Sequence, residues 1–297
     1  MLIGNTALEY GLCLAPMAGY TDSAFREVCH DFGCEYSVSE MISARAVVFG
    51  DKKTHSLAKI SESEGCVALQ IFGNEPTVMA EAAHRLEYGE PGCFAPVAID
   101  INMGCPVHKI FSNDEGSALM RKPRLIEDIV RATSGAVSLP VTVKLRLGID
   151  MASKNVVECA LAAQEGGASA VCVHGRTRVQ MYSGVCDYEK IADVVRSLKI
   201  PVIANGDITD ADSALRVMKD TGASAIAIGR GAVGNPFVFS EIRAALRGEE
   251  YRAPSLEVRV DTALRQLRRA VELHGEEIAV REARKQIALY LSGFRGA

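Results

Sequence analysis

The sequence contains no tryptophan, and aromatic residues make up only 6% of its 297 positions. It has no C-x-x-C pair, so zinc ribbons, ferredoxin clusters and thioredoxin chemistry lack their usual sequence support. No apolar run approaches the roughly 18 residues that a membrane helix needs, and no basic stretch followed by an apolar one opens the chain. We therefore expect a cytoplasmic protein with no membrane segment and no structural metal.

The overall composition is that of an ordinary globular protein. Hydrophobic residues make up 48% and charged residues 24%, which excludes disordered, collagen-like and coiled-coil chains. The net charge of −4 argues against a protein that coats nucleic acid by bulk charge, although a local basic patch is compatible with it. The nine cysteines, an odd number, are expected to be free thiols in a reducing compartment.

Eight short apolar, β-rich runs recur along the chain, and each ends in glycine, polar or charged residues. They are residues 12–19, 36–41, 67–73, 97–104, 141–148, 168–175, 201–207 and 223–229. Helical periodicity separates them, most clearly after Asp207, where Thr209 or Asp210 can cap a helix that ends before Gly222. No G-x-G-x-x-G follows the first run, so a (β/α)8 barrel is favoured over an open sheet.

The composition changes after Pro236. Residues 252–297 carry nine Lys or Arg against six Asp or Glu, a net charge of +3, which leaves −7 for the rest of the chain. Their pattern is helical, and Pro254-Ser255 provides a start signal. We predict a catalytic TIM barrel over residues 1–240 and a small basic helical domain over residues 241–297.

Polar side chains with useful chemistry stand at the carboxyl ends of the predicted strands, where barrel enzymes build their active sites. Read strand by strand, they are Met17, Glu40, Gln70, Asn102 with Cys105, Lys144 with Arg146, His174 with Arg176, Asn205 with Asp207, and Arg230. Loops are polar in general, but that does not explain polar groups in the last turns of Val, Ile and Ala strands.

The ends of the last two strands suggest a phosphate site. The strings are Asn205-Gly206-Asp207 and Gly229-Arg230-Gly231, at the usual phosphate position of barrels. Glycines let backbone N–H groups approach an anion, and Arg230 could supply a bidentate pair. The alternative is that the glycines only permit tight turns.

A phosphate there leaves the barrel mouth free for a flat ring. Gln70 can both donate and accept hydrogen bonds, which suits the edge of a flavin. Lys144 would stabilise the negative charge of a reduced flavin. An ordinary salt bridge from Lys144 to a carboxylate such as Glu40 is the alternative, and spacing alone does not separate the two.

Cys105 differs from the other cysteines because it lies in a Gly/Pro turn that leaves the fourth strand. A protonated thiol in an apolar wall makes it a candidate general acid. His174 could be a base, an acid or a hydrogen-bond donor. No G-x-S-x-G or H-E-x-x-H occurs, so serine-hydrolase and metal-triad chemistry has little support.

Together these motifs resemble the tRNA-dihydrouridine synthases, an FMN-dependent barrel family. The matching strings are LAPMAGYTDSAFR (14–26), SEM (39–41), QIFG (70–73), DINMGCP (100–106), KLRLG (144–148), HGRT (174–177), NGDI (205–208), GRGAVGNP (229–236) and RKQIALYLSGFRGA (284–297). Two departures stand out. The loop VHKIFSNDEGSAL after Cys105 is more acidic than related sequences usually are, and the chain stops at Gly296-Ala297, so the helical domain is expected to be minimal or truncated.

The resemblance implies a role for each matching residue. FMN would be held by Pro16, Met17, Ala18, Gln70, Lys144 and His174 around its ring, and by Asn205, Gly206, Asp207, Gly229 and Arg230 at its phosphate. Asn102, Arg146 and Arg176 would face the uracil together with His174, and Cys105 would be the proton donor.

The resemblance also implies the reaction. NADPH would reduce FMN, hydride would pass to uracil C6 of a D-loop uridine in tRNA, and Cys105 would protonate C5. The base must then leave the RNA stack, and basic side chains of the helical domain would grip phosphates. We expect a monomer.

Two other functions remain open at this point. One keeps the flavin and changes the substrate to a free pyrimidine or another small enone. The other is a tRNA-binding or chaperone protein in which catalysis is secondary, against which the intact set of Cys105, Lys144 and His174 argues.

Overall fold

A closed parallel barrel forms the body of the protein. The computed structural model describes residues 1–90 and 92–293, apart from the side chains of Lys52 and Lys53. In this part of the chain the barrel strands are β3 (Leu12–Leu14), β4 (Tyr36–Val38), β6 (Val67–Phe72), β7 (Ala98–Asn102), β8 (Val141–Leu145), β9 (Ala170–His174), β10 (Val202–Asn205) and β11 (Ala225–Ile228). They pair in chain order, and β11 pairs with β3 to close the ring. The predicted (β/α)8 barrel is confirmed.

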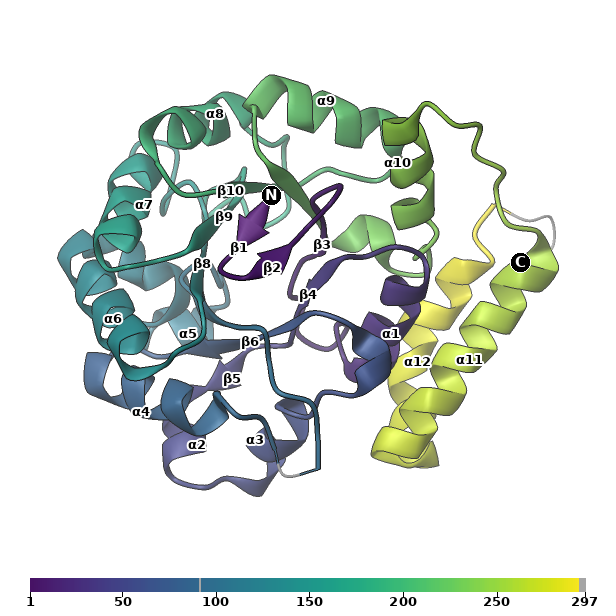
Figure 1. Ribbon diagram of the computed structural model, residues 1–297, viewed down its shortest axis with the longest axis horizontal. Coiled ribbons are helices and arrows are strands. Elements are labelled where there is room, and N and C mark those ends of the chain that lie inside the picture. Colours follow the sequence, from purple (N-terminus) through teal and green to yellow (C-terminus); the bar gives the residue numbers. More distant parts are fainter. Residues whose placement is uncertain (91, 294–297) are drawn as a thin grey trace.

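Helices surround this barrel (Figure 1). They are α1 (Ser23–Asp31), α2 (Ala44–Val48), α3 (Lys52–Leu57), α4 (Pro76–Leu86), α5 (His108–Phe111), α6 (Pro123–Ala136), α7 (Val156–Glu165), α8 (Tyr188–Ser197), α9 (Ala211–Thr221) and α10 (Val238–Arg247), with 3-10 turns η1 (Glu62–Glu64), η2 (Gly116–Arg121) and η3 (Arg230–Ala232). Of the two predicted caps for α9, Asp210 is the N-cap, and Gly222 ends the helix in the left-handed conformation.

The strands are shorter than the apolar runs that predicted them. β3 ends at Leu14 and β4 at Val38, because the residues that follow turn into the loops at the barrel mouth. A further strand, β5 (Ile42–Ser43), pairs with the end of β6. The sequence did not predict it.

A short hairpin closes the amino-terminal end of the barrel. It consists of β1 (Leu2–Ile3) and β2 (Thr6–Ala7). Ile3 and the following Leu8 pack in one cluster with inward-facing barrel residues such as Cys13 and Tyr36. The opposite end, where the strands finish, is therefore the open one.

Two long helices, α11 (Leu256–His274) and α12 (Glu276–Tyr290), lie side by side at one edge of the barrel, next to α1 (Figure 1). Ser255 caps α11, as the sequence predicted. Ion pairs from Arg265 to Asp31 and from Arg269 to Glu27 join α11 to α1. The predicted domain boundary at residue 240 falls inside α10, and the division into two domains stays a prediction. Arg295 and the end of the last matching string, residues 294–297, lie outside the described residues.

Candidate active site

A cavity of about 690 Å³ opens at the carboxyl ends of the strands. That volume lies within the usual range of small-molecule and cofactor sites. The predicted site residues that line it are Pro16, Met17, Ala18, Gln70, Asn102, Cys105, Lys144, Arg146, His174, Asn205, Gly206, Asp207, Gly229 and Arg230. Barrel closure thus brings together side chains that come from seven different strand ends.

A chain of hydrogen bonds starts inside the barrel and ends at Cys105. Buried Asp100 accepts a bond from the Gln70 amide at 2.7 Å, and from the Thr142 hydroxyl at 2.5 Å. Because its nitrogen is held there, Gln70 presents its oxygen to the Asn102 amide at 2.8 Å. The Asn102 oxygen then accepts from the backbone N–H of Cys105 at 2.9 Å. The buried carboxylate therefore fixes the direction of every bond in the chain.

The Cys105 turn is held from its other side as well. Its carbonyl oxygen accepts bonds from the backbone N–H of Ser117 at 3.1 Å and from the Ser117 hydroxyl at 2.8 Å. Burial raises the pKa of the Cys105 thiol, while the N–H of Val107 and the charge of Arg146 oppose that shift. The thiol is therefore protonated at neutral pH and lies at the wall of the cavity.

Lys144 projects into the cavity from β8 and donates to the Asn205 side chain at 3.0 Å. Asn205 is itself anchored, because its amide donates to the Ala227 carbonyl at 2.7 Å. Within residues 1–90 and 92–293 no carboxylate forms an ion pair with Lys144. Glu40 instead accepts the backbone N–H of Gly19, so the geometry does not match the alternative of a Lys144–Glu40 salt bridge.

His174 is a neutral imidazole. Burial lowers its pKa far below the ordinary value, and the nearby charges of Lys144, Arg146, Arg176 and Arg230 lower it further. Of the roles left open by the sequence, a charged imidazolium acid is therefore the least compatible with this site. A neutral ring can still donate one hydrogen bond and accept another.

Arg176 is the one predicted site residue that does not line the cavity. Its side chain is 2% exposed and donates to the carbonyls of Ser183 and Gly184 and to the Asp207 carboxylate at 2.8 Å. This arrangement does not match a direct contact with a substrate. Arg176 fixes the loop 183–186 and compensates the charge of Asp207, whose pKa is lowered by that hydrogen bond although burial opposes the shift.

The loops after β10 and β11 form the far end of the cavity. Gly206 has φ +121°, and a Cβ there would lie 2.3 Å from the sulfur of Cys186. A Cβ on Gly231 would lie 2.2 Å from the Ile208 carbonyl oxygen. Both positions therefore need glycine for close packing, which supports the tight-turn explanation without excluding an anion. Arg230 lines the cavity, lies 4.7 Å from the centroid of the Tyr182 ring and forms an ion pair with Asp207 at 3.8 Å.

The family model described as "Dihydrouridine synthase (Dus)" matches residues 13–297. A probable tRNA-dihydrouridine synthase of Rickettsia conorii is 42% identical, over 99% of this chain and 90% of its own length. The tRNA-dihydrouridine synthase B of Shewanella oneidensis is 41% identical, over 98% and 89%. The chain belongs to the dihydrouridine synthase family.

Solved structures more distant in sequence share the fold of this dihydrouridine synthase. An old yellow enzyme homologue from Zymomonas mobilis is 11% identical, with a TM-score of 0.55 over 84% of this chain and 92% of that one. Morphinone reductase is 13% identical, with a TM-score of 0.60 over 87% and 91%. At such identities the likeness shows the barrel alone.

Several cavity residues of this dihydrouridine synthase are not among the predicted site residues, for example Met41, Tyr182 and Leu289. Tyr182 is 53% exposed and lies in a polar loop, with its ring centroid 6.5 Å from that of His174. Leu289 comes from α12, which places the C-terminal helices at the edge of the mouth. Met41 and Leu289 lie in strings that carry the family resemblance, but no local pattern assigned any of the three a place in the site.

The described residues contain no helix that is both long and apolar enough to cross a membrane. They contain no group of three or more His, Cys, Asp or Glu side chains placed to hold a metal ion.

Proposed function

We propose that this dihydrouridine synthase reduces the C5–C6 double bond of uridines in the D-loop of tRNA, using FMN that NADPH reduces. The observation that carries the proposal is the meeting of Cys105, Lys144 and Gln70 in one cavity of a chain that matches the family over nearly its whole length.

The residues of the cavity fit FMN. Beyond its bonds to Asp100 and Asn102, Gln70 keeps one amide N–H and one oxygen lone pair for a ligand, and Lys144 provides a positive charge at the same cavity. Pro16, Met17 and Ala18 form an apolar wall, and the loops at Gly206 and Gly229 with Arg230 would hold the phosphate. The charge of Asp207, which would repel a phosphate, is already compensated by Arg176.

When bound, FMN supplies the hydride that adds to uracil C6. Cys105 supplies the proton at C5, since burial keeps its thiol protonated. Arg146 and neutral His174 lie at the same cavity and would stabilise charge on the uracil carbonyls as it develops. Three hydrogen bonds to the carbonyls of Gly104, Thr177 and Met181 hold Arg146 in place for this role.

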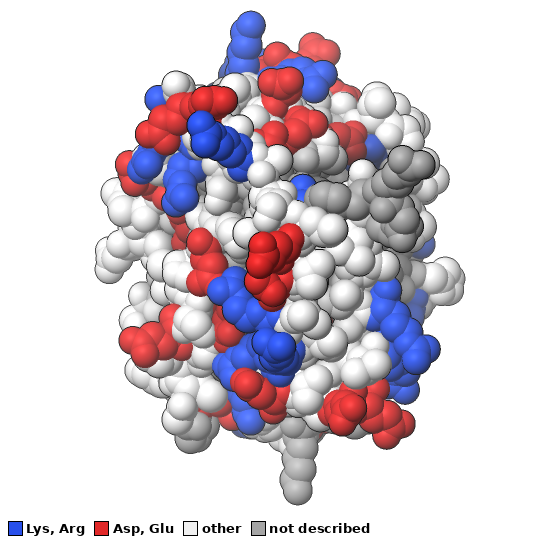
Figure 2. Space-filling model, turned by 90° about the vertical axis from the view of Figure 1, so that its right-hand side faces the viewer, with Lys and Arg blue, Asp and Glu red and all other residues white. Residues whose placement is uncertain are grey.

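The tRNA is proposed to bind across the mouth and the C-terminal helices. The face that carries α11 and α12 mixes basic and acidic side chains rather than forming a continuous basic surface (Figure 2). Arg265 and Arg269 hold α11 on the barrel, and Lys285 stacks on Tyr20. Four further arginines, Arg252 just before α11 and Arg268, Arg281 and Arg284 on the two helices, form neither an ion pair nor a ring contact in the described part of the chain. We expect these four to contact phosphates, with salt-dependent binding.

A NADPH reductant, a monomeric state and a cytoplasmic location are part of the same proposal. Because tRNA is a cytoplasmic substrate, the proposed reaction is consistent with that location. Mass measurement in solution and a comparison of NADPH with NADH as reductant test the other two.

The pH dependence of uridine reduction should have a single alkaline limb. The protonated thiol of Cys105 is present below its pKa and is lost as the pH rises through it, and burial raises that pKa above its reference value of 9.0. We therefore expect a level rate from about pH 6 to pH 9 and a fall above it. Single-turnover rates of the reduced enzyme across this range measure it. An inflection near pH 6.5 would instead indicate a titrating His174.

The proposal as a whole is tested with the purified protein, FMN, NADPH and tRNA from a strain that lacks dihydrouridine. We expect a yellow protein that forms dihydrouridine in the D-loop and turns over free uracil at least about 100-fold more slowly. Equal turnover of free uracil would favour the small-substrate reductase. A colourless protein that binds tRNA and forms no dihydrouridine would favour the binding or chaperone function.

A further inference from the structure

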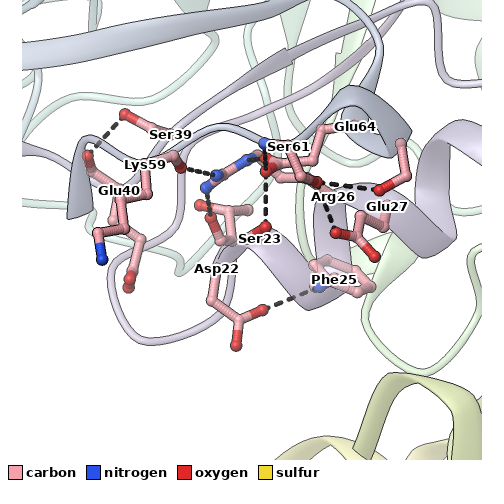
Figure 3. A network of polar contacts seen from close by, with 12 residues as sticks. Asp22, Ser23, Phe25, Arg26, Glu27, Ser39, Glu40, Lys59, Ser61 and Glu64 are labelled. Carbon is pink, nitrogen blue, oxygen red and sulfur yellow. Dashed lines mark hydrogen bonds and ion pairs between the residues drawn. The ribbon is translucent and has the colours of Figure 1, made fainter. Parts of the chain in front are cut away.

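A buried ion pair lies behind the loop that carries Met17, outside the cavity. It joins Arg26 of α1 to Glu64 of η1 at 2.5 Å. Arg26 is 2% exposed and Glu64 is 1% exposed. Figure 3 shows the pair at the centre of contacts from α1 and from the segment 59–64.

Both charges of the pair are fully engaged. The second oxygen of Glu64 accepts the hydroxyl of Ser23 at 2.6 Å and the backbone N–H of Ser61 at 2.7 Å. The guanidinium of Arg26 also donates to the Lys59 carbonyl at 3.4 Å. The pair is thus held rigidly between α1 and the segment that leads into β6.

One bond of Arg26 points back toward the cavity. Its Nη1 donates to the carbonyl of Thr21 at 2.7 Å. The hydroxyl of Thr21 in turn accepts the backbone N–H of Met17 at 3.0 Å. The N–H groups of Tyr20 and Thr21 bond to the Met17 carbonyl at 2.9 and 3.0 Å. Met17 lines the cavity, so the ion pair connects through a single residue, Thr21, to a wall of the site.

A contribution to stability is a weak explanation for such a pair. The free-energy cost of removing two charges from water cancels much of the attraction between them. Buried ion pairs can therefore often be replaced by apolar side chains without loss of stability. Arg26 also donates a directional hydrogen bond that fixes the loop 16–21, and apolar side chains cannot replace that bond. The two explanations therefore predict different results for an apolar double variant.

We infer that Arg26 and Glu64 are positioning residues for the cofactor: they hold the loop of Met17 in the conformation that binds the flavin. This inference rests on the proposed FMN site. Without the guanidinium, the Thr21 carbonyl loses its buried donor, and the loop gains conformations in which Met17 and its neighbours Pro16 and Ala18 no longer form the wall.

The test compares the double variant R26M/E64L with wild type as apoproteins. We expect a melting temperature within a few degrees of wild type and a dissociation constant for FMN at least ten-fold higher, measured by quenching of flavin fluorescence. The matched control is R85M/E81L, which removes an exposed ion pair of α4 and should leave FMN affinity unchanged. A folded R26M/E64L that binds FMN as tightly as wild type would overturn the inference.

A second variant covers the case in which R26M/E64L does not fold. Thr21→Val removes only the hydroxyl that accepts the Met17 N–H and leaves the ion pair in place. It should also weaken FMN binding, and unchanged affinity in folded Thr21→Val would overturn the inference in that case. If wild type itself does not bind FMN, the proposed function fails instead, so the two failures are distinguishable.

Discussion

Cys105→Ala is expected to keep its FMN and to lose uridine reduction by about 100-fold or more, the usual contribution of a positioned proton donor. The thiol lies at the cavity wall, and bonds from Asn102 and Ser117 fix its turn from both sides. Alanine keeps the backbone of that turn and removes only the sulfur. Single-turnover mixing of reduced enzyme with unmodified tRNA measures the effect, and the affinity for tRNA should change less than two-fold.

The matched control is Cys66→Ala. Cys66 is also a partly buried thiol whose pKa burial raises, but it is not part of the cavity lining. This variant should react at the wild-type rate. Full activity of Cys105→Ala would refute the role of proton donor, whereas equal losses in both variants would point to general damage of the fold.

Much of the cavity was predictable because the strands of a barrel end at one level. The register places Gln70 beside Asp100, Asn102 beside Lys144, and His174 beside Asn205. Apolar runs in the sequence locate the strands, and closure of the ring then brings their last residues together. Reading the ends of those runs therefore predicted most of the cavity lining without any knowledge of the loops.

The remaining features depend on tertiary contacts that no local pattern reports. Arg176 follows β9 just as Arg146 follows β8, yet its side chain packs under the loop 183–186 instead of lining the cavity. Leu289 reaches the mouth because α11 and α12 dock against α1, through a buried cluster of Ala24, Ala270 and Ala279 and through ion pairs such as Arg265–Asp31. Such pairs form between partly exposed residues, and the periodicity of either helix does not indicate them.

For Asp100, one part of its role was predictable from the sequence and another part depends on tertiary contacts. The sequence indicated the string around it, but its function became clear only from the bonds through Gln70 and Asn102 to the Cys105 turn. An aspartate inside an apolar strand is costly unless it is fully bonded. Here hydrogen bonds from Gln70 and Thr142 offset the cost of burying Asp100. The same bonds fix the orientation of the polar groups in the barrel mouth.

Lys144→Met is expected to slow uridine reduction by about 100-fold and to make the reduction potential of bound FMN more negative. The ammonium lies at the cavity, and its bond to Asn205 fixes its position. Burial lowers its pKa, but the nearby Asp100 carboxylate opposes that shift. Methionine keeps an unbranched side chain that is one atom shorter and removes the charge that stabilises the reduced cofactor.

The reduction potential of bound FMN distinguishes this electrostatic role of Lys144 from a purely steric one. Equilibration of the bound flavin with reference dyes measures it directly, independently of turnover. Lys190→Met, which removes an ammonium paired with Asp193 on the outer helix α8, is the control and should leave both rate and potential unchanged. An unchanged potential in Lys144→Met would show that the lysine only positions Asn205, since losing a buried positive charge beside the reduced cofactor must destabilise its negative form.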